Sequence, residues 1–126
     1  MASGPTEPPP TISTHVLDTE LGRPAAGVHV TLYRLSDDGR PLRLTQALTD
    51  GDGRVRDLLE RPLVAGDYRL EFALGALDPV DTAPPEPDAG RFFRRVAIDL
   101  HVTDTSRSYH VPLLIAPFSL TTYRGS

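Results

Sequence analysis

Hydrophobic and polar residues alternate with a period of two along several segments of the chain, which is the pattern of half-buried β-strands. In the first of these segments Ile12 and Val16 share one face, while Ser13, His15 and Leu17 lie on the other. No long segment has the three-to-four-residue period of an amphipathic helix. The strands that this pattern predicts are 11–18, 27–35, 42–48, 66–74, 92–103 and 109–115.

Turn-forming residues separate these strands. Residues 36–39 (Ser-Asp-Asp-Gly) and 49–53 (Thr-Asp-Gly-Asp-Gly) have the composition of tight hairpin-type connections. Short strands at this spacing predict an all-β sandwich with at most one short helix. The chain contains no Trp and no Cys, which argues against a true immunoglobulin domain.

Two segments depart from the strand pattern. Residues 1–10 include four prolines and almost nothing apolar, so we expect a disordered leader there. Residues 75–90 include four prolines and four acidic residues, and we expect them to form a long surface loop. A single domain should therefore span 11–126, with 116–126 as a tail after the last strand. The chain shows no secretory signal and no apolar run long enough to span a membrane, so we expect a cytoplasmic protein.

Composition excludes several kinds of chemistry. Without Cys there are no disulfides or thiolate sites, and because all 13 basic residues are Arg there is no lysine for Schiff-base catalysis. The net charge of −4 argues against nucleic acid as a partner. The chain also lacks a G-x-S-x-G nucleophile motif and a phosphate-binding loop.

Histidine is the side chain best suited to acid–base work near neutral pH, and the chain has four. His29 and His101 each lie opposite the apolar set of their strand, so we expect them to be solvated surface residues. The pattern alone does not distinguish His15 and His110 from them. No pair has zinc-type spacing, and the Asp50–Gly53 segment fits a turn better than a calcium loop, so we expect no metal site.

Three segments together carry a resemblance to a known family. They are Ile12-Ser13-Thr14-His15-Val16-Leu17-Asp18-Thr19 with Gly22-Arg23-Pro24-Ala25, then Thr49-Asp50-Gly51-Asp52-Gly53-Arg54, and finally Tyr109-His110-Val111-Pro112-Leu113-Leu114 with Tyr123-Arg124-Gly125-Ser126. The chain resembles the 5-hydroxyisourate hydrolases, the transthyretin-related enzymes of urate breakdown, over nearly all of 11–126. The terminal Tyr-Arg-Gly-Ser is the most specific part of this resemblance.

The resemblance implies a fold, an assembly and a site. The fold would be a transthyretin-like (prealbumin-like) sandwich of two four-stranded sheets, assembled as a homotetramer with active sites at the interfaces between dimers. No cofactor and no metal are implied. The implied catalytic residues are His15, Arg54, His110 and Ser126, and the implied substrate-binding residues are His15, Arg54, Tyr123, Arg124 and Gly125.

The implied reaction is hydrolysis of 5-hydroxyisourate to 2-oxo-4-hydroxy-4-carboxy-5-ureidoimidazoline. Water attacks a lactam-type carbonyl and the six-membered ring opens. One of His15 and His110 would take the proton of the water, and the other would orient the water or donate a proton. Arg54 would bind the substrate and stabilise the developing oxyanion.

Three other functions stay open at this point. The protein could be a non-catalytic, transthyretin-like carrier of a small aromatic ligand, although a carrier has no reason to keep His15, Arg54, His110 and the tail together. It could be a plain β-sandwich interaction module. It could also hydrolyse a related cyclic ureide, because the segments 75–90 and 116–120 depart from the family pattern, as does Ser108, where a histidine is common.

Overall fold

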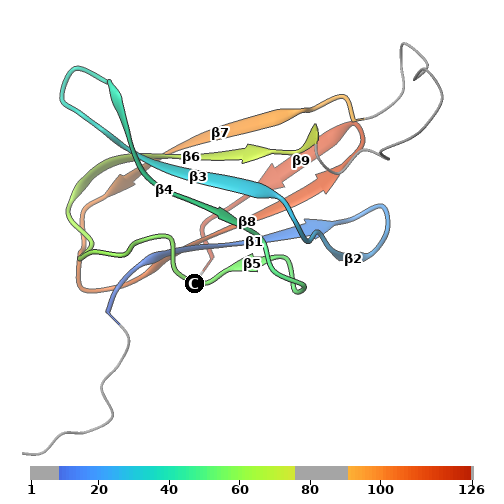
Figure 1. Ribbon diagram of the computed structural model, residues 1–126, viewed down its shortest axis with the longest axis horizontal. Helices are drawn as coiled ribbons and strands as arrows, with labels where there is room; N and C mark the ends of the chain where they lie inside the picture. The colour runs from blue at the N-terminus through green and yellow to red at the C-terminus, as the bar shows by residue number, and fades with distance from the viewer. Residues whose placement is uncertain (1–8, 76–90, 126) are drawn as a thin grey trace, which may run out of the picture.

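Two β-sheets pack face to face in the computed structural model, which describes residues 9–75 and 91–125 (Figure 1). No α-helix occurs within these residues. The predicted all-β sandwich is therefore confirmed. Most of the predicted leader (residues 1–8), most of the predicted surface loop (76–90) and Ser126 lie outside the described residues.

The first sheet has the strand order β2-β1-β8-β9, and β5 also pairs with β1. Its strands are β1 (Ile12–Asp18), β2 (Arg23–Pro24), β5 (Arg54–Val55), β8 (Tyr109–Ala116) and β9 (Ser119–Thr122). β1 and β8 run parallel, whereas the other pairs of this sheet are antiparallel. The parallel pair joins the first and last long strands of the described chain.

The second sheet has the strand order β4-β3-β6-β7, and all its pairs are antiparallel. Its strands are β3 (His29–Leu35), β4 (Pro41–Leu48), β6 (Gly66–Ala73) and β7 (Arg95–Val102). Two cross-strand ion pairs, Arg69–Asp99 and Glu71–Arg95, and the hydrogen-bonded pair Asp67–His101 join β6 to β7 on the outer face of this sheet. This outer face is therefore charged.

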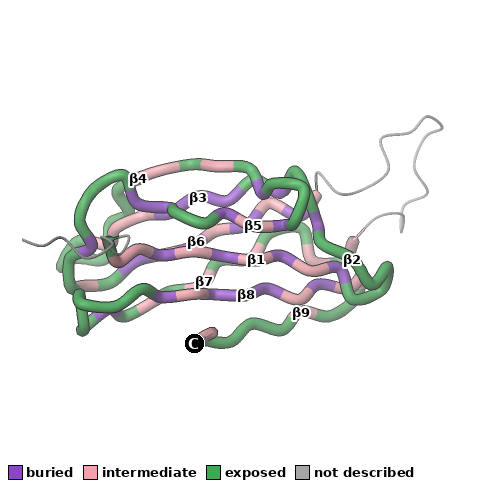
Figure 2. Tube along the Cα trace, turned by 90° about the horizontal axis from the view of Figure 1, so that it is seen from below, coloured by how far each residue is buried: buried purple, intermediate pink, exposed green. Residues whose placement is uncertain are grey.

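The core lies between the two sheets, because the apolar side of each alternating strand turns inward. Buried and half-buried positions alternate along β1, and along β8 except at Pro112, which is also buried (Figure 2). The largest fully buried side chains are Tyr68, Phe72, Ile12, Leu32, Leu58, Leu70, Leu74, Leu113 and Ile115. The half-buried residues of β1 and β8 consequently lie on the outer face of the first sheet.

The stretch between β5 and β6 is anchored by leucines. Leu58 and Leu63 are buried in the core, and Leu59 is 5% exposed.

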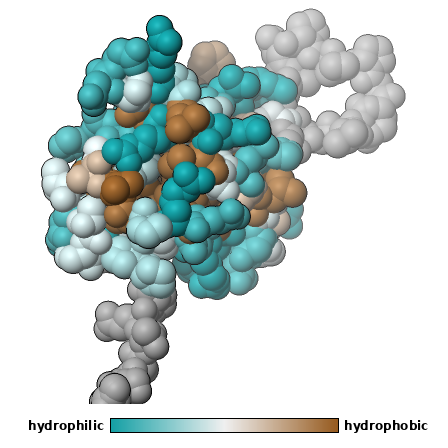
Figure 3. Space-filling model, turned by 60° about the vertical axis from the view of Figure 1, so that its left-hand side comes forward, coloured by the Kyte–Doolittle hydropathy of each residue, from teal (hydrophilic) through white to brown (hydrophobic). Residues whose placement is uncertain are grey.

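Apolar side chains also gather among polar ones on the end of the molecule seen in Figure 3. One hollow of about 240 Å³ is lined by Leu42, Leu44, Leu59, Val64, Tyr68 and neighbouring side chains.

The strand predictions are confirmed for the six longer strands, with ends that differ by up to three residues. The differences lie in the short strands. Residues 23–24 and 54–55 pair with β1 over two residues each, and 119–122 forms β9 where only a tail was expected. Strands this short are too brief to show an alternation, so only their pairing reveals them.

Candidate active site

Ser13 and His15 lie on the outer face of the first sheet, because the intervening residues of β1 face the core. Thr14 is buried, and its hydroxyl donates a hydrogen bond to the Val111 carbonyl oxygen at 2.6 Å. This contact fixes β1 against β8. The parallel register then sets Ser13 beside His110 and His15 beside Pro112.

The turn before β5 brings Arg54 next to His15. The Asp50 carboxylate accepts hydrogen bonds from the backbone N–H groups of Asp52 and Arg54, at 2.8 and 3.0 Å. Gly53 has φ of 75°, and a Cβ atom there would collide with the Val16 carbonyl oxygen, so this position needs glycine. The turn ends in β5, where Arg54 is the cross-strand partner of His15.

The same turn also holds the His15 ring. Nε2 of His15 lies 2.8 Å from the carbonyl oxygen of Asp52. A carbonyl oxygen can only accept, so Nε2 carries the hydrogen and Nδ1 is the basic nitrogen when this histidine is neutral.

The His110 ring is held between β1 and the C-terminal tail. Its Nδ1 lies 2.8 Å from the Ser13 hydroxyl oxygen. On the other side, the Gly125 backbone N–H donates to the His110 carbonyl oxygen at 2.7 Å, and a Cβ atom on Gly125 would come within 2.7 Å of ring atom Cδ2. The chain after β9 therefore packs directly on this ring.

A hollow of about 230 Å³ opens beside these groups and is lined by Ser13, Thr14, Arg54, Val55, Arg56 and His110. Burial lowers the pKa of His110 below its ordinary value, and the nearby charges of Arg54 and His15 lower it further. His110 is consequently a neutral base at neutral pH. The hollow combines that base with an always-charged guanidinium.

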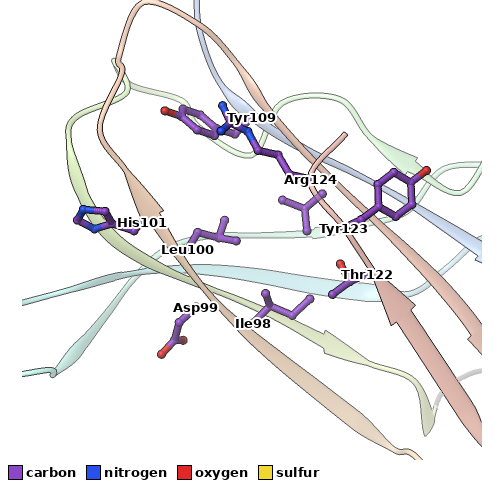
Figure 4. A pocket seen from close by; sticks show the side chains of 9 residues that line it. Ile98, Asp99, Leu100, His101, Tyr109, Thr122, Tyr123 and Arg124 are labelled. Carbon is purple, nitrogen blue, oxygen red and sulfur yellow. The ribbon is translucent and has the colours of Figure 1, made fainter. Parts of the chain in front are cut away.

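A second, more apolar hollow of about 320 Å³ lies between β7 and the segment that includes β9 and the tail (Figure 4). Tyr123 and Arg124 line it, together with Ile98, Leu100 and Tyr109. The Arg124 guanidinium lies 4.6 Å from the centre of the Tyr109 ring, a cation–π contact.

The structure thus divides the predicted site residues. His15, Arg54, His110 and Gly125 come together on the outer face of the first sheet, although they come from four separate segments. The side chains of Tyr123 and Arg124 line the other hollow. Ser126 lies outside the described residues.

Two contributions to the site were missed by the sequence reasoning. Ser13 shares the outward face of β1 with His15, and that alternation was the available signal. The Asp52 carbonyl oxygen had no signal, because any residue has one. His29 and His101, expected to be surface residues, are both exposed, and His101 pairs with Asp67 at 2.6 Å.

The described residues contain neither a cluster of potential metal ligands nor a membrane-spanning helix. In the part of the chain that the structure describes, no three His, Cys, Asp or Glu residues are grouped so that they could hold a metal ion. No helix among those residues has the length and apolar character needed to cross a membrane.

Comparison with known proteins identifies the family. A model of the HIUase/Transthyretin family matches residues 12–125. The 5-hydroxyisourate hydrolase of Deinococcus radiodurans is 44% identical over 119 residues, covering 93% of this chain and 97% of that protein. The Klebsiella pneumoniae 5-hydroxyisourate hydrolase structure matches with a TM-score of 0.73 and 34% identity, over 93% of this chain and 99% of that one.

A transthyretin has the same fold. Sea bream transthyretin, solved in complex with thyroxine, matches with a TM-score of 0.77 and 26% identity, over 90% of this chain and 93% of that one. The predicted transthyretin-like sandwich is therefore confirmed, with β5 added beside the four-stranded path of the first sheet. Its sequence and its fold both show that the chain belongs to the HIUase/Transthyretin family.

Proposed function

We propose that this protein hydrolyses 5-hydroxyisourate in urate breakdown. The observation that carries the proposal is the meeting of His15, Arg54 and His110 on one sheet face, with the tail glycine packed on the His110 ring. The near-full-length similarity to proteins named 5-hydroxyisourate hydrolase supports the same activity.

In this proposal His110 is the general base. Its low pKa keeps it neutral, and it takes a proton from the water that attacks the lactam carbonyl carbon. Arg54 binds the carbonyl oxygen and stabilises the negative charge that develops there. The carbon–nitrogen bond then breaks, the leaving nitrogen takes up a proton, and the ring-opened carboxylate forms.

His15 and the tail have supporting roles in the proposal. The Asp52 carbonyl oxygen holds His15 so that its other nitrogen can orient the water or return a proton. Ser126 follows Gly125 and is proposed to bind the polar edge of the substrate. Tyr123 and Arg124 are proposed to contact substrate only where a neighbouring subunit completes the site.

We also propose that the active protein is a homotetramer, with each site at an interface between dimers. The support is an apolar strip on the outer face of the first sheet. Leu17 is the cross-strand partner of both Leu114 and Pro24, and the two leucines are half-buried in the single chain. A second subunit over this sheet face would also exclude water from the hollow lined by Arg54 and His110.

The test is the fate of 5-hydroxyisourate generated in place by urate oxidase. We expect the absorbance of this compound to decay faster with the protein than without it, and the product to be optically active. Decay at the spontaneous rate, with a racemic product, would reject the hydrolase and direct attention to ligand binding or to another ureide.

Variants of the site sharpen this test. Arg54→Ala and His110→Ala should each lower kcat/KM by about 10²–10⁴-fold, because each removes a group that acts on the reacting atoms. Both residues lie on a partly exposed outer face, so the melting temperature should change little. Exposed His29→Ala is the matched control and should keep wild-type activity. Near-normal rates in both site variants would contradict the assigned roles.

A further inference from the structure

Ser13 has a contact that the proposed mechanism does not use. Its hydroxyl oxygen lies 2.8 Å from Nδ1 of His110, and the two residues are cross-strand partners in the parallel β1–β8 pair. The buried bond from Thr14 to the Val111 carbonyl oxygen fixes this register. The Ser13 hydroxyl is therefore held against one particular nitrogen of the ring.

The other nitrogen of the ring remains available. Ring atom Cδ2, which is bonded to Nε2, lies on the side where Gly125 approaches closely enough to exclude a side chain. Ser13 therefore contacts the Nδ1 side of the ring, and the Gly125 backbone lies near its Cδ2 side. Nε2 is then the nitrogen that remains for a molecule in the hollow lined by His110 and Arg54.

A serine hydroxyl can either donate to Nδ1 or accept from it, and the two cases give different tautomers. The guanidinium groups of Arg54 and Arg56 line the hollow and are always charged. A lone pair on Nε2 is stabilised beside such charges, whereas an N–H dipole directed at them is not. This favours the case in which Nδ1 carries the hydrogen and Ser13 accepts it.

We propose that Ser13 is a positioning residue that holds neutral His110 in the Nδ1–H tautomer, so that a bare Nε2 faces the substrate hollow. The catalytic part of this inference rests on the proposed function, because only a general base needs a bare Nε2. A free histidine in water prefers the opposite tautomer, with the hydrogen on Nε2. Removal of the Ser13 hydroxyl should therefore allow His110 to adopt the Nε2–H tautomer.

The first test is ¹⁵N NMR of the imidazole nitrogens in the full chain, at a pH where His110 is neutral. We expect the wild type to show the Nδ1–H tautomer at His110. Ser13→Ala should shift the population toward Nε2–H, and Ser13→Thr, which keeps the hydroxyl, should restore Nδ1–H. Thr45→Ala in β4 of the opposite sheet is the matched control, and the signals of His15 serve as an internal reference.

The second test is steady-state turnover of 5-hydroxyisourate. Ser13→Ala should lower kcat by about tenfold, the scale of one lost hydrogen bond, with little change in KM. The acid limb of its pH–rate profile should also move, because the hydrogen-bond partner of the titrating ring has gone. Ser13→Thr should recover most of the rate.

The outcomes separate this inference from the proposed function. A wild-type protein with the Nε2–H tautomer at His110, or an unchanged tautomer in Ser13→Ala, would overturn the role of Ser13 even if turnover is normal. A tautomer shift in a protein that never accelerates 5-hydroxyisourate decay would reject the hydrolase and leave the positioning contact standing. If Ser13→Ala does not fold, the wild-type tautomer and Ser13→Thr still decide.

Discussion

Gly125 shows how a single residue type can be required by a neighbour rather than by its own backbone. The tail crosses the His110 ring so closely that a Cβ atom at position 125 would lie 2.7 Å from Cδ2. That distance is well below ordinary van der Waals contact. Position 125 therefore needs glycine, because any side chain there would prevent the tail from packing on the His110 ring.

Gly125→Ala should therefore separate activity from stability. The added methyl group must push either the tail or the His110 ring aside, so we expect kcat/KM to fall by about tenfold or more. The melting temperature should barely change, because the residue lies outside the core. An unchanged rate would mean that the position of the tail is not needed for catalysis.

The titration of His110 gives a second prediction at this scale. By NMR, His110 should titrate below the ordinary imidazole pKa of 6.5, because burial and the charges of Arg54 and His15 oppose its protonation. Arg54→Gln should raise this pKa. The unfolded chain binds the proton more readily, so this group should lower the folding stability as pH falls below about 6.5. A pKa at or above 6.5 in the wild type would contradict this electrostatic account.

At the scale of elements, a buried ion pair connects the end of β1 to the segment that precedes β7. Asp18, the last residue of β1, is 5% exposed, and its carboxylate lies 2.8 Å from the Arg91 guanidinium. It also accepts the backbone N–H groups of Glu20 and Leu21. Burial raises the pKa of Asp18, but the hydrogen bonds from Leu21, Arg91 and Glu20 and the charge of Arg91 more than offset this, so the net pKa is lowered.

Arg91→Ala should destabilise the fold by about 2 kcal/mol, because it removes a charged hydrogen-bond donor from a buried carboxylate. Urea unfolding measures this loss. Arg40→Ala is the matched control: it breaks an ion pair with Asp38 in which both side chains are more than half exposed, and it should leave the unfolding curve unchanged. If both changes lower the free energy of unfolding equally, burial of the Asp18–Arg91 pair contributes nothing to stability.

The longer strands were predictable for a physical reason. Each has one face in the core and one outside, so the alternation of β1 or β6 is visible in the residues themselves. β5 and β9 are held by pairing to strands that lie far away in sequence, and nothing local marks them. His15, Arg54 and His110 could be selected only by resemblance, because their meeting depends on a register that the sequence does not display. The alternation of β1 does place Ser13 on the outward face with His15, but its contact with His110 depends on the same register.

At the scale of the whole molecule, the two outer faces differ. That of the second sheet has the ion pairs between β6 and β7, whereas that of the first sheet has the site and the apolar strip of Leu17, Leu114 and Pro24. Charged side chains are typical of a surface that is exposed to solvent, whereas an apolar strip is typical of a surface that another protein covers. The proposed subunit interface therefore belongs to the first sheet.

Leu114→Arg should disrupt the proposed tetramer and lower the activity with it, because it places a charge in the apolar strip. Light scattering after size-exclusion chromatography should give four copies for the wild type and fewer for the variant. Ala97→Arg, on the exposed outer face of β7, is the matched control and should leave the mass unchanged. A wild-type monomer with full turnover would contradict the proposed assembly.

The parallel pairing of β1 with β8 has a consequence for how the protein is made. Ser13 and His110 are separated by 97 residues, yet their contact forms part of the site. A nascent chain holds His15 and Arg54 early but lacks β8, the strand that pairs with β1, until Tyr109–Ala116 has been synthesised. Closing such long loops is slow, so activity should appear only after β8 leaves the ribosome and docks beside β1. A chain interrupted before β8 should then be inactive.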